Sequence, residues 1–248
     1  MLSRLTLGAL LAFATAACVE QDADEGAPMA REGAAADKGG DLAACAISGE
    51  GDEPPFKDPE SGFWDQGTWG ACGYVALINA NIIAGADDTG GKFEKAVRDC
   101  MHGRGFTDDM LRQGTGPTRE QIISDCKEAA MAAQGTPVAI VNAPLCELSC
   151  EDRAKQMEVA DAVLDAGGAA TIALLSSGGG GHALTVTSMT PSASSEGGWD
   201  VELMDPNFPG YVLPLTLGPC GEVVAVPDDI DWISKDMSAC RMAIEARV

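Results

Sequence analysis

A cysteine and a glutamine six residues apart stand just before the first long apolar segment of the chain. Cys72 precedes the apolar run at 75–83, so it lies at the expected N-terminus of a helix. Unpaired N–H groups and the helix dipole at that position favour a thiolate over a thiol. The side-chain amide of Gln66 is a donor that can reach the oxygen of a carbonyl under attack. The pair predicts a thiol nucleophile with a donor for the oxyanion.

Of the two histidines, His182 is the better placed to act as a base. It follows the glycine run 178–181 and begins an alternating segment at 182–189, which predicts a strand. His102 lies at an expected helix C-terminus, where an imidazole needs no chemical role, and we interpret it as a surface residue. A turn at 190–198 leads into a second alternating segment, 199–205, which returns antiparallel.

The pairing of these two segments predicts the residue that orients His182. Apolar residues oppose one another in the register that pairs Leu184 with Leu203 and Val186 with Val201. In that register His182 lies across from Asp205, with Cβ atoms about 4.5–5.5 Å apart. A slip of two residues would bring Asn207 opposite the histidine instead. We therefore expect Asp205 to orient His182, with Asn207 as the alternative.

Segment patterns along the chain predict helices first and strands afterwards. Helices are expected over 72–84, 92–102, 118–134, 151–166 and 235–246, and Ser149 is the expected cap of the fourth. Strands are expected over 137–141, 170–175, 182–189, 199–205, 211–217 and 222–226. This order is typical of an α+β domain.

These residues resemble the papain-like cysteine peptidase superfamily, most of all the bacteriocin-processing peptidases of the double-glycine leader type. The resembling pieces are Gln66 followed by Cys72-Gly73, Ala76-Leu77-x-Asn79, Gly181-His182 and Asp205-Pro206. They cover about 66–84 and 170–213. The resemblance implies a papain-like fold, in which a helical part carries Cys72 and a later antiparallel sheet carries His182 and Asp205. It also implies that Gln66 helps to form the oxyanion hole, Cys72 attacks, His182 is base and acid, and Asp205 orients it.

The N-terminal residues predict export. Residues 1–18 have the pattern of a secretory signal peptide, with an apolar stretch too short to span a bilayer. The ending Thr15-Ala16-Ala17-Cys18 looks like a bacterial lipobox, which implies lipidation of Cys18. Residues 19–60 are rich in Ala, Gly, Asp, Glu and Pro and are expected to be a flexible acidic tether to a folded domain at 61–248. The expected location is the cell envelope, through a lipid anchor, or outside the cell.

The nine cysteines of this chain predict disulfides and bear directly on Cys72. If Cys18 carries lipid and Cys72 is a nucleophile, seven cysteines remain, which leaves an unpaired thiol after three bridges. If Cys72 is structural, eight remain and four bridges form. If Cys18 is unmodified, Cys72 is available as the odd cysteine of nine. Two alternatives stay open: Cys72 is the free nucleophile, or it is one half of a fourth disulfide.

Composition narrows the class of partner. The formal charge of −22 opposes nucleic acid and anionic membrane surfaces as partners. No cofactor or metal is expected, because Cys146-x-x-x-Cys150 has no nearby histidine and the glycine run 178–181 lacks the Lys-Ser/Thr of a phosphate loop. The sequence therefore predicts an exported cysteine peptidase that hydrolyses amide bonds in peptides or proteins. The alternatives are a related acyl-transfer enzyme, of deamidase or transglutaminase type, and a non-catalytic disulfide-stapled envelope lipoprotein.

Overall fold

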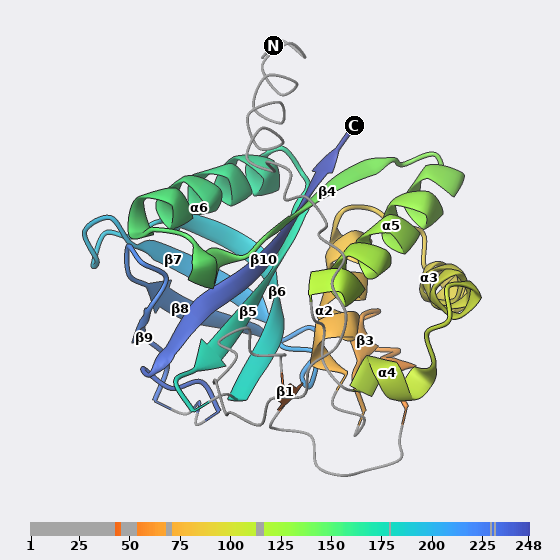
Figure 1. The fold of residues 1–248 in the computed structure, drawn as a ribbon, viewed down its shortest axis with the longest axis horizontal. Coiled ribbons are helices and arrows are strands. Elements are labelled where there is room, and N and C mark those ends of the chain that lie inside the picture. Colours follow the sequence, from red (N-terminus) through yellow and green to blue (C-terminus); the bar gives the residue numbers. More distant parts are fainter. Residues whose placement is uncertain are drawn as a thin grey trace, which may run out of the picture. The chain divides into compact units, whose positions relative to one another are not determined.

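The described part of the chain contains both helices and strands, labelled in Figure 1. The computed structural model describes residues 43–45, 54–67, 71–112, 117–178, 180–228, 230 and 232–248. The strands are β1 (Ala43–Cys45), β2 (Phe56–Lys57), β3 (Trp64–Asp65), β4 (Val138–Ala143), β5 (Ala169–Ser176), β6 (Gly180–Pro191), β7 (Trp199–Met204), β8 (Val212–Leu217), β9 (Val223–Ala225) and β10 (Met237–Arg247). The helices are α2 (Cys72–Ile83), α3 (Lys92–Gly103), α4 (Asp108–Arg112), α5 (Pro117–Ala133) and α6 (Cys150–Asp165), with short 3-10 turns η2 (Thr89–Gly91) and η3 (Leu145–Glu147).

Most of the strands form one sheet. Its order is β4-β10-β5-β6-β7-β8-β9, and these neighbours pair antiparallel. The short β1 pairs with β6 in parallel, and β2 and β3 form a separate two-stranded ribbon. The described residues all lie in one compact unit, Asp41–Val248. This combination of helices and a largely antiparallel sheet confirms the α+β class.

Helices pack on both faces of this sheet (Figure 1). α2 contacts β5 and β6, and α3 and α5 pack against α2 through a core that includes Ile78, Phe93 and Met131. α6 contacts β5, β6 and β10 from the other side. Its N-terminus is capped as expected, because the Ser149 hydroxyl accepts from the N–H of Asp152. Residues 72–81 of α2 are all buried, so the first helix runs through the core with its N-terminus against β6.

The expectation of a closing helix at 235–246 is wrong. Met237–Arg247 forms β10, which pairs with β4 along one edge and with β5 along the other. The segment is rich in Ala, Met, Glu and Arg, which favour helices in isolation. In the fold it lies between β4 and β5, and its backbone N–H and C=O groups form hydrogen bonds with both strands. Tertiary pairing therefore overrides local propensity here.

The predicted register of the β6–β7 pair is also wrong. The observed apolar pairs are Val186 with Leu203 and Met189 with Val201. A bulge in β6 between Val186 and Ser188 adds a residue to that strand, so both apolar pairs form, which a regular register does not allow. Beyond the last observed pair, Thr185 with Met204, this shift would set His182 across from Asn207. β7 ends at Met204, however, and Asp205 follows outside the strand.

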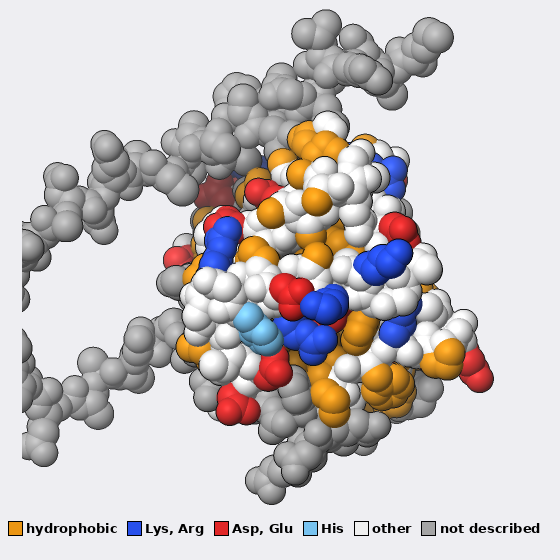
Figure 2. All heavy atoms as spheres, turned by 90° about the vertical axis from the view of Figure 1, so that its right-hand side faces the viewer, with side chains coloured by type: hydrophobic (Ala, Val, Ile, Leu, Met, Phe, Trp, Pro, Cys, Tyr) orange, Lys and Arg blue, Asp and Glu red, His pale blue; other side chains and the backbone are white. Residues whose placement is uncertain are grey.

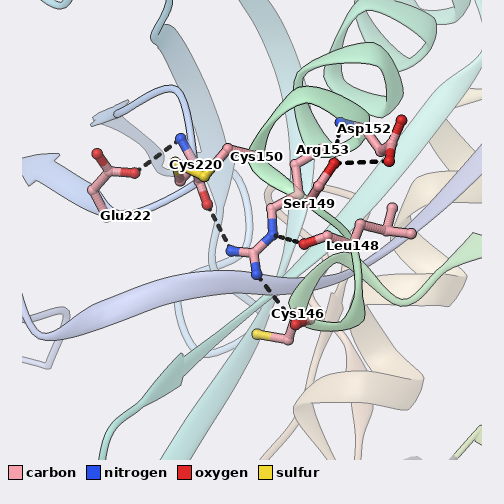
Figure 3. Close-up of a disulfide and its surroundings, with 8 residues drawn as sticks. All are labelled: Cys146, Leu148, Ser149, Cys150, Asp152, Arg153, Cys220 and Glu222. Atoms are coloured by element: carbon pink, nitrogen blue, oxygen red, sulfur yellow. Dashed lines mark hydrogen bonds between the residues drawn. A yellow bond between two sulfur atoms is a disulfide. The ribbon is translucent and has the colours of Figure 1, made fainter.

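Three disulfides join elements that are far apart in the sequence, as the prediction of disulfides requires. They are Cys100–Cys126, Cys146–Cys240 and Cys150–Cys220. Figure 3 shows how Arg153 supports the last of these: its guanidinium donates to the carbonyls of Cys220, Cys146 and Leu148. The first bond joins α3 to α5, the second joins η3 to β10, and the third joins the start of α6 to the connection after β8.

Two strands lie within the range expected to be a tether. β1 pairs with β6, and β2 pairs with β3. Lys57 also donates to the carboxylate of Asp88 at 2.8 Å. The signal peptide and the lipidation of Cys18 lie outside the described residues and stay predictions. The tether also stays a prediction for 19–42 and 46–53.

Candidate active site

Cys72 is the first residue of α2, as expected, and it lies against the strand that begins near His182. Its Sγ accepts a hydrogen bond from the backbone N–H of Ala183 at 3.4 Å. The side chain packs with Ala76, Ala173 and Ala183, and only 1% of the residue is exposed. The sulfur therefore combines a helix N-terminus with one strand donor, and both would stabilise a thiolate at this position.

The sequence left open whether Cys72 is a free nucleophile or one half of a fourth disulfide. In the structure Cys72 is disulfide-bonded. Six other cysteines are already joined in pairs. Its partner is thus Cys18 or Cys45, whose side chains lie outside those that the structure describes. As it stands, the sulfur is protected rather than available for attack.

His182 and Asp205 come together, although the register that predicted the contact is wrong. Nε2 of His182 lies 2.9 Å from Oδ1 of Asp205, and the two side chains are 2% and 1% exposed. The distance is that of an ion pair, but the direction of the ring N–H does not meet the geometry of a hydrogen bond. Such contacts are often poorly aligned before a substrate is bound. Nδ1 of His182 is buried without a hydrogen-bond partner among the described residues.

The Asp205 carboxylate is held by three hydrogen bonds from two residues and by its contact with His182. Oδ1 receives the backbone N–H of Asn207 at 2.8 Å and its side-chain amide at 3.1 Å, in addition to the His182 contact. Oδ2 receives the indole N–H of Trp232 at 2.9 Å. Burial raises the pKa of Asp205, but His182 and Asn207 outweigh burial and hold this pKa below the ordinary value of 3.8. The carboxylate is therefore ionised and fixed in orientation.

Asn207, the alternative orienting residue, connects Asp205 to Gln66. Its Oδ1 accepts from Nε2 of Gln66, and the backbone N–H of Gln66 donates to the carbonyl of Pro206 at 2.9 Å. Asn207 thus donates to the orienting carboxylate and fixes the expected oxyanion donor. The sequence Asp205-Pro206-Asn207 is a turn signal in which an aspartate accepts from the backbone two residues on, and it could have predicted this contact.

Trp232 is the residue of this site that the sequence analysis missed. It lies between β9 and β10, and its ring contacts Phe208 with centroids 5.3 Å apart. No spacing or pattern in the sequence connects Trp232 to Asp205, which lies 27 residues earlier. Only the tertiary structure brings the indole to the carboxylate.

The assembled site is closed. Gln66, Cys72, His182 and Asp205 are each at most 1% exposed. A cavity of about 30 Å³ touches the first turn of α2 at Gly73, with the Arg241–Glu120 ion pair in its wall. A volume of this size holds about one water molecule and no peptide side chain. A peptide substrate could therefore not reach the Cys72 sulfur through this cavity.

The other histidine differs from His182 in its surroundings. His102 lies at the end of α3, and its Nε2 is 2.9 Å from Oδ1 of Asp108, with both side chains more than 40% exposed. Figure 2 shows a histidine side chain among acidic and basic side chains on one face of the molecule. His102 is exposed. It is a surface residue, as expected. Within the described ranges no group of three or more metal-ligating side chains occurs, and no helix is long and apolar enough to cross a membrane.

Comparison of the chain with protein-family models, with curated proteins and with solved structures found no match. What the site can do is therefore argued from its own geometry. A sulfur at a helix N-terminus, an imidazole on a carboxylate and a fixed side-chain amide suit covalent acyl transfer once the sulfur is a thiolate.

Proposed function

We propose that this protein is an exported cysteine peptidase of papain-like architecture, with Cys72, His182, Asp205 and Gln66 as its catalytic residues. The observation that carries the proposal is the buried His182–Asp205 pair at 2.9 Å, beside the strand residue that donates to the Cys72 sulfur. Burying two ionisable groups costs free energy that apolar residues would not cost. A buried ionisable pair beside a strand residue that contacts a cysteine at a helix start supports a chemical role.

The reaction follows from the positions of the donors. The Cys72 thiolate attacks the carbonyl carbon of the substrate, and the oxyanion accepts from the backbone N–H of Cys72 and from Gln66. His182 then delivers a proton from Nδ1 to the leaving amine, and the C–N bond breaks. A water molecule, activated by the same nitrogen, attacks the acyl-enzyme and releases the carboxylic acid. Asp205 keeps Nε2 oriented throughout.

Export and the substrate class belong to the same proposal. The disulfides of the described residues are of the kind that forms in oxidising compartments, which supports export by the signal peptide. The lipid anchor at Cys18 is part of the same proposal. The substrate is a peptide or protein, and no cofactor or metal takes part.

A second candidate, a non-catalytic disulfide-stapled envelope lipoprotein, is favoured by one observation: Cys72 is disulfide-bonded. In that case the His182–Asp205 pair is structural and Cys72 serves only as a link. The two candidates differ in what happens when the bond is opened.

The test is hydrolysis of casein by the mature protein with a mild thiol reductant. We expect hydrolysis, loss of activity after alkylation with iodoacetamide, and the adduct on Cys72. Cys72→Ala should abolish hydrolysis. The matched control is the Cys100→Ala/Cys126→Ala double variant, which removes a disulfide between α3 and α5 and should remain active. Two outcomes would contradict the peptidase proposal. One is full activity in Cys72→Ala, and the other is no hydrolysis by a folded protein in which Cys72 has been shown to be reduced.

A further inference from the structure

We propose that the edge of β6 beside His182, which β7 leaves unpaired, is the peptide-binding edge of the site. The chain's own strand β1 occupies this edge, and Cys45 is the disulfide partner of Cys72. The N-terminal segment is then an internal inhibitor bound covalently to the nucleophile. This inference rests on the proposed function, because it assigns the substrate-binding mode and the regulation of the same site.

The edge is identified by the pairing of β6. β5 pairs with one edge of β6 from Gly181 to Val186. β7 pairs with the other edge only from Thr185 onwards. Residues 180–184 of β6, which include His182, therefore do not pair with β7 along the second edge. Since β5 occupies the first edge at Gly181, β1 must pair along the second, where Ala43 lies opposite Gly180 and Cys45 opposite Gly181.

The Cys72 sulfur lies on this same edge. The N–H of Ala183 donates to Sγ, so the polar backbone groups of Ala183 point away from β5. Along a strand these groups alternate between the two edges, and Gly181 therefore points the same way as Ala183. The two positions are about 6.6 Å apart along the strand. Because β1 runs parallel to β6, its chain is directed from Gly181 towards the sulfur as it passes Cys45.

The identity of the partner follows by elimination. Cys72 is disulfide-bonded, and three bonds already use six of the other cysteines. Only Cys18 and Cys45 remain. Cys45 is the last residue of the strand that runs to the sulfur, whereas nothing described places Cys18 there. This assignment also leaves Cys18 available for lipid. The cysteine count therefore agrees with four disulfides and a lipidated Cys18.

The occupied edge explains how a peptide would reach a closed site. An extended peptide added to an exposed strand edge gains backbone hydrogen bonds whatever its side chains are. Gly180 and Gly181 offer such an edge without side chains of their own to obstruct it. With β1 in place, the edge and the sulfur are both taken, which agrees with the 1% exposure of Cys72. The substrate class is thus an extended polypeptide segment, as β1 is.

Release requires a thiol reductant, which donates two electrons in two exchange steps. A thiolate attacks the Cys45 sulfur, because Cys72 is buried; the S–S bond breaks and Cys72 leaves as a thiolate. A second thiol then attacks the mixed disulfide on Cys45, which leaves a Cys45 thiol and an oxidised disulfide of the reductant. The helix N-terminus and the Ala183 N–H favour this direction of exchange, since they stabilise the Cys72 thiolate.

The first measurement maps the bridge in the untreated mature protein by non-reducing proteolysis and mass spectrometry. We expect a peptide pair that joins Cys45 to Cys72. A free Cys72 thiol, or a bond from Cys72 to Cys18, would overturn the inference. This measurement does not depend on any variant or on activity.

The second measurement compares Cys45→Ser with Cys18→Ser, both without reductant. We expect Cys45→Ser to be alkylated at Cys72 by iodoacetamide and to hydrolyse casein at the rate of the reduced wild type. Cys18→Ser should show less than about a tenth of that rate until a reductant is added. If the bridge maps to Cys45 but Cys45→Ser has a reactive Cys72 and no hydrolysis, the peptidase proposal fails. If the untreated wild type is fully active with a free Cys72, the internal inhibitor fails and the peptidase stands.

Discussion

The protein contains two histidine–aspartate pairs with the same separation and opposite surroundings. Nε2 lies 2.9 Å from a carboxylate oxygen in both, in His182–Asp205 and in His102–Asp108. The first pair is 2% and 1% exposed and its carboxylate accepts from Asn207 and Trp232 as well; the second is 42% and 44% exposed. Distance alone therefore does not mark a functional site.

What differs is the cost of keeping each pair. An exposed pair is screened by solvent and contributes little, so its geometry needs no support. A buried pair requires further donors to compensate for desolvation, and these donors fix the carboxylate and the ring. The comparison indicates that the donors around Asp205, rather than the ion pair itself, distinguish a site that can do chemistry.

The largest difference is expected in activity. His182→Gln should lower kcat/KM for casein-derived peptides by about 10²–10⁴-fold, because it removes the proposed general base but keeps an amide next to Asp205. His102→Gln should leave kcat/KM within twofold. Both variants are assayed with reductant present. Equal effects of the two substitutions would mean that the buried pair has no catalytic role.

The next largest difference between the two histidine–aspartate pairs is expected in the free energy of unfolding. Asp205→Ala leaves a buried imidazole without its partner and should lower the free energy of unfolding by about 3–5 kcal/mol. Asp108→Ala removes an exposed partner and should cost less than about 1 kcal/mol. Urea unfolding with the disulfides intact measures both. Comparable losses in the two variants would refute the argument from burial.

The donors around Asp205 can be tested through Trp232. Trp232→Phe keeps a ring beside Phe208 but removes the N–H that Oδ2 accepts, a bond to a charged group that is worth about 1.5–3 kcal/mol. The pKa of Asp205 should rise, and the acid limb of the pH–rate profile should move to higher pH. The control is Trp199→Phe, because the buried indole N–H of Trp199 has no hydrogen-bond partner among the described residues. An unmoved acid limb in Trp232→Phe would remove this tryptophan from the positioning network.

The smallest effect concerns the pH dependence of stability. The pKa of Asp205 in the folded protein is below 3.8, so the unfolded state binds more protons in the range between the two values. The stability that the ionised carboxylate contributes should be complete above about pH 5 and should decrease as the pH falls through 3.8 towards the folded pKa. It amounts to about 1.4 kcal/mol per unit of pKa difference. Urea unfolding of wild type and Asp205→Asn at pH 6 and pH 3 measures it; a difference between the two proteins that grows on acidification would reverse the assigned sign.

Much of the fold could be predicted from local patterns. α2, α3, α5, α6 and the strands from β4 to β9 lie near their expected ranges, because their apolar periodicity and end signals agree with the environment that they occupy. β10 could not be predicted in this way. Its residues favour a helix, and its strand conformation comes from partners at 138–143 and 169–176.

The candidate site shows the same division. The types and order of these residues follow from the sequence. Cys72, His182 and Asp205 stand at recognisable ends of elements, and Gln66 lies six residues before Cys72. Their contacts do not follow from the sequence. The β6–β7 register differs from the expected one, and Asp205 contacts His182 from outside β7, which ends at Met204. Asn207 and Trp232 join the site through bonds that no local pattern encodes, apart from the turn at Asp205.

Local sequence patterns predict the α+β class and place Cys72 at a helix start, and they leave two alternatives for this cysteine, a free thiol or one half of a fourth disulfide. The disulfide-bonded state follows from the tertiary structure, because disulfide bonding depends on which chain segments meet in space. The same structure pairs β1 with the edge of β6 that β7 leaves open, where we propose that Cys45 is the partner of Cys72. Local periodicity specifies where an element begins and which face it buries, but the partner at an open edge is set by the whole fold.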